Sequence, residues 1–177
     1  MRKRKPCSGI ARFCSAPLIL YLLAGCGGGG TAAPAAQYAI GGTATGLMQG
    51  ASLTLLDNGG NALTLTQNGS FMFTGSLAGG VHYAVTVGTQ PTGQTCLIAN
   101  GSGTASAAVS NVAVSCTTNT YTVGGMISGL TSSGLVLANG TDVLAVSPSS
   151  TSFTMPTAIA YGGVYEITVK TQPVASA

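Results

Sequence analysis

Short stretches of alternating apolar and polar residues recur along most of this chain, and they predict strands rather than helices. Side chains two residues apart lie on the same face of a strand, so the apolar members of each stretch are expected to face a core. The clearest sets are Leu53/Leu55, Phe71/Phe73, Tyr83/Val85/Val87 and Val112/Val114/Cys116. The expected strands lie near 38–45, 51–56, 62–66, 70–74, 81–88, 94–98 and 109–117. They predict an all-β, seven-stranded β-sandwich.

Turn-forming residues separate these strands. Asp57-Asn58-Gly59-Gly60 and Asn68-Gly69 are typical of tight turns, because Gly and Asn adopt positive φ angles at little cost. Asp57 is therefore interpreted as a turn residue, and Asp142 as its counterpart in a second turn beside Asn139-Gly140.

The sandwich sequence recurs once, with a period of 82 to 83 residues. Tyr38-Ala39-Ile40-Gly41-Gly42 returns as Tyr121-Thr122-Val123-Gly124-Gly125, and the stretch 83–87 returns as 165–169. Solenoid units are shorter, at about 20–45 residues, so this period favours separate domains. We call residues 38–118 the first repeat and residues 119–177 the second repeat.

The second repeat matches only the first five expected strands, and it lacks counterparts of Cys96 and Cys116. It is therefore expected to expose unpaired strand edges and part of an apolar face. Either the reading frame is a truncated part of a longer multi-repeat protein, or another chain supplies a strand by β-addition. Truncation is favoured, because β-addition requires a dedicated partner.

Composition supports the all-β prediction. Hydrophobic residues make up 45% of the chain and charged residues only 5%, against roughly 25% charged residues in an average globular protein. Exposed helix faces normally draw on Glu, Lys, Arg and Gln, which are scarce here.

The N-terminal segment has the pattern of an export signal. A basic start, Met1–Lys5, is followed by the apolar stretch 16–23, which is shorter than the roughly 20 residues needed to span a bilayer. Leu23-Ala24-Gly25-Cys26 directly follows and resembles the bacterial lipobox. The resemblance implies that residues 1–25 are a lipoprotein signal peptide, that Cys26 carries diacylglycerol and a further acyl chain such as palmitate, and that 26–37 form a flexible tether. An ordinary cleaved signal with an incidental Cys26 is the alternative.

Residue 27 and the positions of the cysteines bear on where in the cell the protein is expected to lie. Gly27 is not Asp, so the usual inner-membrane retention signal of lipoproteins is absent, and the resemblance implies anchoring at the outer membrane, on either side. Cys7 and Cys14 would leave with the signal peptide, so Cys96 and Cys116 remain as a pair in an oxidising compartment. A disulfide is expected between them, because two thiols without a nearby His or carboxylate make a poor zinc site.

Charge and chemistry exclude several classes of function. After signal removal Lys170 is the only Lys or Arg, against Asp57, Asp142 and Glu166, which gives a net charge of −2. Nucleic acids and anionic lipid headgroups need clustered basic residues, so neither is an expected partner. His82 is the only histidine and alternates with core positions, which predicts an exposed strand residue. No acid/base pair, metal site or cofactor is expected, and the chain is predicted not to be an enzyme.

The repeat resembles transthyretin-like sandwiches, such as carboxypeptidase regulatory-like and related Ig-like modules. The resemblance depends on Gly41-Gly42-Thr43, Leu53-Thr54-Leu55, the run 68–73 and the run 79–87. The runs 89–96 and 111–116 are also similar to a repeat of proteobacterial lipoproteins of unknown function. Such folds specify a scaffold and no activity. The sequence thus predicts a non-catalytic, lipid-anchored envelope module, a spacer or interaction scaffold. The alternative is an adhesin or glycan-binding module using the loops 88–94 and 100–106, although Trp is absent.

Overall fold

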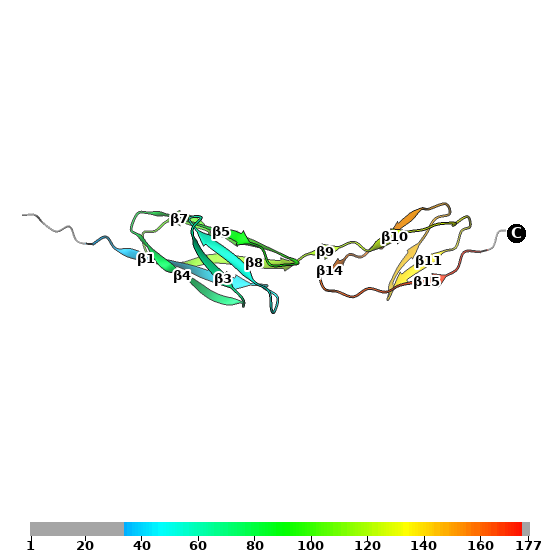
Figure 1. The fold of residues 1–177 in the computed structure, drawn as a ribbon, viewed down its shortest axis with the longest axis horizontal. Coiled ribbons are helices and arrows are strands. Elements are labelled where there is room, and N and C mark those ends of the chain that lie inside the picture. The colour runs from blue at the N-terminus through cyan, green and yellow to red at the C-terminus, as the bar shows by residue number, and fades with distance from the viewer. Residues whose placement is uncertain (1–33, 175–177) are drawn as a thin grey trace, which may run out of the picture. The chain divides into compact units, whose positions relative to one another are not determined.

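The computed structural model describes residues 34–174, and every regular element among them is a strand (Figure 1). The all-β prediction is confirmed. The first repeat contains β1 (Gln37–Thr45), β2 (Leu53–Asp57), β3 (Asn61–Leu65), β4 (Gly69–Ala78), β5 (His82–Thr89), β6 (Gln94–Ala99), β7 (Ser102–Thr104) and β8 (Val109–Thr118). The second contains β9 (Thr120–Tyr121), β10 (Gly124–Met126), β11 (Val136–Asn139), β12 (Asp142–Ala145), β13 (Ser152–Thr154), β14 (Ile159–Ala160) and β15 (Ile167–Thr171).

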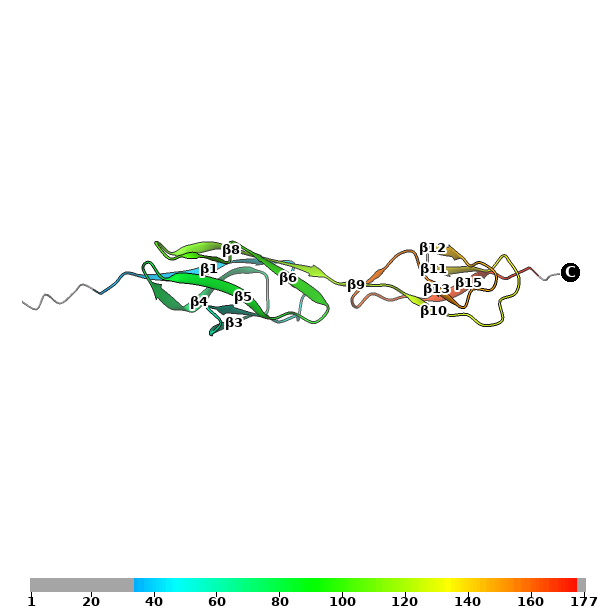
Figure 2. The same cartoon turned by 90° about the horizontal axis from the view of Figure 1, so that it is seen from above.

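The strands of the first repeat form two four-stranded sheets, which face each other as the layers of a sandwich (Figures 1 and 2). One sheet has the order β4-β1-β8-β6 and the other the order β3-β2-β5-β7. Neighbouring strands are antiparallel except β1 and β8, which run parallel. The last long strand of the repeat therefore lies beside the first one.

The core of the first repeat lies between these sheets, at the positions that the alternation predicted. Leu53 and Leu55 are fully buried, and the aromatic and β-branched members of the other sets are also inside, except Val87, which is partly buried against the core. The buried cluster consists of Ile40, Ala44, Leu47, Leu53, Leu55, Phe71, Phe73, Tyr83, Val85, Cys96, Ala105, Val112, Val114 and Cys116. Burying this apolar surface is the main force that holds the sheets together.

Turn chemistry shapes the ends of the strands. Asn58 and Gly59 have φ angles of 51° and 72° in the three-residue connection 58–60 between β2 and β3, and both residue types adopt positive φ at little cost. Asp57 opens this turn as expected, because its carbonyl accepts from the Gly60 amide at 3.2 Å. It is also the last residue of β2 and is buried, and its Oδ1 accepts a hydrogen bond from the Ala84 amide at 3.3 Å. The carboxylate therefore ties β2 to β5 rather than only capping a turn.

The first repeat has one strand more than the seven expected. Strand β7, Ser102–Thr104, contains no large apolar side chain and exists through its antiparallel pairing with β5. Strand β4 also continues to Ala78, beyond the expected end near residue 74, because its second half pairs with Gln37–Ala39 after a register shift at residues 73–75. Both additions depend on pairing with distant strands rather than on local apolar alternation.

The second repeat forms smaller sheets. Strand β10 pairs with β13, β9 pairs with β14, and β11 lies between β12 and β15. Its buried cluster consists of Leu135, Leu137, Val146 and Met155. This repeat thus has a core of its own, smaller than that of the first repeat.

Candidate functional site

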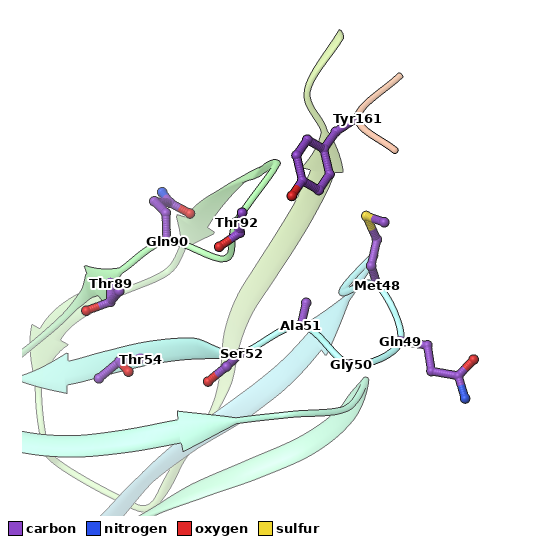
Figure 3. A pocket seen from close by; sticks show the side chains of 10 residues that line it. All are labelled: Met48, Gln49, Gly50, Ala51, Ser52, Thr54, Thr89, Gln90, Thr92 and Tyr161. Atoms are coloured by element: carbon purple, nitrogen blue, oxygen red, sulfur yellow. The ribbon is translucent and has the colours of Figure 1, made fainter. Parts of the chain in front are cut away.

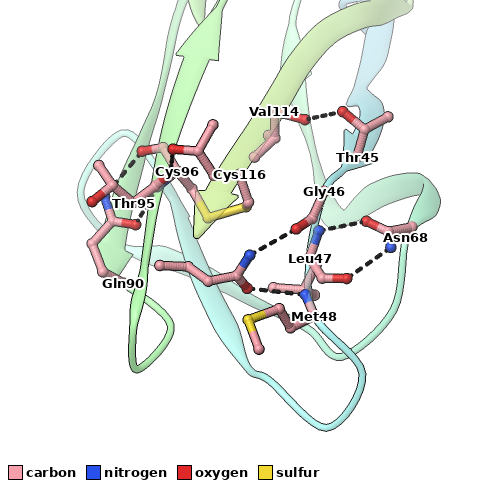
Figure 4. The surroundings of a disulfide bond; sticks show 12 residues. Thr45, Gly46, Leu47, Met48, Asn68, Gln90, Thr95, Cys96, Val114 and Cys116 are labelled. Atoms are coloured by element: carbon pink, nitrogen blue, oxygen red, sulfur yellow. Dashed lines mark hydrogen bonds between the residues drawn. A yellow bond between two sulfur atoms is a disulfide. The ribbon is translucent and has the colours of Figure 1, made fainter. Parts of the chain in front are cut away.

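The predicted cysteine pair is a disulfide in the structure. Cys96 on β6 and Cys116 on β8 lie directly opposite each other in the antiparallel register, and their sulfur atoms are bonded (Figure 4). Both residues belong to the buried core, with exposed fractions of 2% and 6%. The covalent bond therefore fixes the edge strand β6 to β8 from inside the sandwich.

Two glutamines that no sequence pattern pointed to hold the chain around this disulfide, Gln90 (Figure 4) and Gln94. The Gln90 side chain donates from Nε2 to the Cys96 carbonyl at 2.9 Å and accepts from the Cys96 amide at 2.7 Å. Gln94 is buried, donates to the Gly46 carbonyl at 2.7 Å and accepts from the Met48 amide at 2.9 Å. Each amide satisfies backbone groups that pair with no strand, so both glutamines have structural roles.

The Asn68 side chain holds the loop after β1 in a similar way, by two hydrogen bonds to its backbone. Its side chain accepts from the Leu47 amide and donates to the Leu47 carbonyl, both at 2.8 Å (Figure 4). The expected turn at Asn68-Gly69 is thus joined to a loop 21 residues earlier. This explains how a polar turn residue orders the buried Leu47.

His82 and the charged side chains of the described residues lie in separate segments of the chain. His82 is exposed at the start of β5, as expected. Asp142 is the first residue of β12, and its Oδ2 accepts from the Thr157 amide at 3.1 Å. Glu166 and Lys170 are exposed. In the part of the chain that the structure describes, no three His, Cys, Asp or Glu side chains gather at metal-binding distance.

One open pocket of about 460 Å³ lies at the end of the first repeat (Figure 3). It is lined by the loop 48–52, by Thr54, by Thr89, Gln90 and Thr92, and by Tyr161 of the second repeat. Hydroxyl groups and one aromatic ring therefore meet there, and Tyr161 is 42% exposed. Part of the expected loop 88–94 lines this pocket, whereas the loop 100–106 does not.

Several large apolar side chains of the second repeat are exposed. Val164, Met126 and Tyr165 are 94%, 89% and 62% exposed. Tyr165 matches Tyr83 of the first repeat, which is only 7% exposed and lies against Gly103 of β7. The described residues of the second repeat include no strand in the place of β7, β6 or β8.

The predicted lipidation site, Cys26, and the predicted signal peptide, 1–25, lie outside the described residues. Among residues 34–174, no helix has the length and apolar character needed to cross a membrane. Comparisons of the chain with protein-family models, with curated proteins and with solved structures find no match.

Proposed function

We propose that this chain is a non-catalytic, lipid-anchored protein of a bacterial cell envelope, which acts as a spacer or an interaction module. The observation that carries the proposal is the buried Cys96–Cys116 disulfide in a sandwich with very few charged side chains. Disulfides form and persist in oxidising compartments outside the cytoplasm, which agrees with an export signal ahead of the sandwich. Leu23–Cys26, with its resemblance to the lipobox, supplies the anchor in this proposal.

The anchor is tested by labelling bacterial cells that express the full chain with radioactive palmitate. The unsubstituted chain should incorporate label, and Cys26→Ser should incorporate none, because the thiol that receives the lipid is gone. Cys14→Ser is the matched control, since it removes a cysteine of the same segment and should keep the label. Equal labelling of the unsubstituted chain and Cys26→Ser would show that Cys26 carries no lipid.

The second candidate function is glycan binding, and the pocket beside Tyr161 favours it. Sugars stack on exposed aromatic rings and bond to hydroxyl groups, and this pocket offers Tyr161 with Ser52, Thr54, Thr89 and Thr92. A glycan array probed with the full chain should then show binding that Tyr161→Ala lowers by about tenfold or more. Tyr165→Ala removes an exposed tyrosine outside this pocket and should leave binding unchanged. An array without signal from a folded chain would leave the spacer or protein-interaction role.

A further inference from the structure

One turn occurs at the same place in both repeats, after β4 and after β14. Residues 78–81 and residues 160–163 each form a four-residue turn closed by a hydrogen bond from its last amide to its first carbonyl, at 3.1 Å and 2.8 Å. The third residue of each turn is a glycine with a left-handed φ, 86° and 78°. The second residue is Gly79 in the first repeat but Tyr161 in the second. The Tyr161 side chain is therefore particular to the second repeat.

The Tyr161 ring lies against the first repeat, at the turn that leads into β6 (Figure 3). This turn, 91–94, is closed by the Gln94 amide, which donates to the Pro91 carbonyl at 3.2 Å. Its third residue, Gly93, has a φ of 72°, and a Cβ added there would collide with the Tyr161 ring. The ring therefore occupies a place that only a glycine leaves open.

A single residue, Asn119, connects β8, the last strand of the first repeat, to β9, the first strand of the second. Its amide donates to the Gly93 carbonyl at 2.9 Å, and its carbonyl accepts from the Tyr161 amide at 2.8 Å. Its side-chain Oδ1 accepts from the Thr95 hydroxyl at 2.8 Å. Asn119 is therefore bonded to both repeats.

The residues on both sides of Asn119 are paired as well. Thr118 lies opposite Gln94 of β6, and Thr120 lies opposite Ala160 of β14. A flexible linker can rotate because its backbone groups bond only to water. Rotation of one repeat about Asn119 would instead break hydrogen bonds that its amide and carbonyl make within the protein.

We propose that Gly93, Asn119 and Tyr161 form a joint that fixes the orientation of the second repeat on the first. This inference deepens the spacer role proposed above and rests on it for its function, because a spacer with a fixed joint holds what it carries in a set direction. Domains of one chain move relative to one another by default unless a large apolar interface holds them. The joint restrains the repeats in another way, through a one-residue connection that is bonded to both.

The joint contains no charged residue. The segments that meet there, 91–95, 118–122 and 159–163, include no Asp, Glu, Lys or Arg. Contacts between exposed charges weaken as ionic strength rises, whereas packing and hydrogen bonds between neutral groups do not depend on such screening. The orientation of the repeats should therefore be the same at low and at high salt.

Residual dipolar couplings of the backbone amides measure this orientation. The sample is the full chain carrying Cys7→Ser, Cys14→Ser and Cys26→Ser, which has no lipid and keeps the Cys96–Cys116 disulfide. In a stretched neutral gel, one alignment tensor should fit the amides of both repeats, at low and at high salt. Two tensors of different magnitude would overturn the proposal, because they would show that the repeats reorient independently.

Tyr161→Ala removes the ring from the joint. The degrees of alignment of the two repeats should then differ by about a third or more, as NMR order parameters differ between rigid and flexible backbone. Tyr161→Phe is the matched control, because it keeps a ring against Gly93, and it should keep one tensor. Unchanged amide shifts of the core residues Leu55 and Leu137 show that both repeats are folded in each variant. A single tensor in Tyr161→Ala, or its loss in Tyr161→Phe, would contradict the role of the ring.

Gly93→Ala tests the same contact from the first repeat. Gly59→Ala is its matched control, because both glycines have a φ of 72°, but no atom lies within 4 Å of a Cβ at Gly59. The two substitutions strain the backbone alike, so only Gly93→Ala should give two tensors. The proposal fails if both variants keep one tensor.

The outcome is independent of the palmitate experiment, since this chain lacks Cys26. Independent reorientation of the repeats would overturn the joint and leave the anchor in place. Equal palmitate labelling of the unsubstituted chain and Cys26→Ser would overturn the anchor and leave the joint.

Discussion

Leu55→Ala should lower the free energy of unfolding of the first repeat by about 2–5 kcal/mol, the usual range when a buried leucine is replaced by alanine. Leu55 is 0% exposed in the middle of β2, between Leu63 on one neighbouring strand and Val87 on the other. Both sheets surround it, so the cavity that the substitution leaves can collapse only in part. Small domains are stable by about 5–15 kcal/mol, which makes this loss a large fraction of the total.

Urea denaturation of the full chain measures the effect. The chain has no Trp, so the transition is followed by circular dichroism and by the fluorescence of tyrosines such as the buried Tyr83. Leu97→Ala is the matched control, because it makes the same chemical change on β6 at a side chain that is 72% exposed. Its effect should stay within about 0.5 kcal/mol. Similar losses at Leu55 and Leu97 would contradict the proposed packing of the sandwich.

The core of the first repeat could be predicted from the sequence because strand side chains alternate with a period of two. Leu53/Leu55 and Val112/Val114 each place two apolar groups on one face, and this local pattern is enough to assign them to the core. The same alternation predicted an exposed His82 and a core-facing Cys116. These assignments needed no knowledge of how the strands are ordered.

Other features depend on the strand order and could not be predicted from local pattern. Strand β7 is recognised only beside β5, because Ser102–Thr104 has no apolar alternation. Gln90 lies in the loop before β6 and Gln94 at the start of β6, and neither has a local pattern that predicts its role. Each nevertheless bonds to backbone groups that the fold brings near. The parallel neighbour of β1 is β8, which lies far along the chain. The Thr45 hydroxyl donates to the Val114 carbonyl, and these two residues are 69 positions apart in the sequence.

Sequence alignment of the repeats indicates that strands are missing from the second one, but it does not say which edge they leave open. The structure assigns that edge through Gly125 and Gly129, since their counterparts Gly42 and Gly46 face the backbone of β8.

Removing the disulfide should have the second large effect. Cys96→Ala with Cys116→Ala should lower the free energy of unfolding by about 3 kcal/mol, because the bond closes a loop of 20 residues and so restricts the unfolded chain. For a domain of this size, each kcal/mol of lost stability lowers the Tm by about 4–8 °C. Strand β6 is an edge strand held by β8 on one side, so it should detach first when the bond is absent.

Calorimetry of the oxidised chain, the reduced chain and the double variant separates the contribution of the bond from that of the substitutions. Reductant should lower the Tm of the unsubstituted chain towards that of the double variant and leave the double variant unchanged. Hydrogen exchange should then show faster exchange of the β6 amides, while those of β2 stay protected, because β2 lies in the other sheet. If reductant left the Tm of the unsubstituted chain unchanged under conditions that reduce the bond fully, the disulfide would not stabilise the sandwich. The stability of the first repeat would then have to come from its core and from the hydrogen bonds of Gln90 and Gln94 alone.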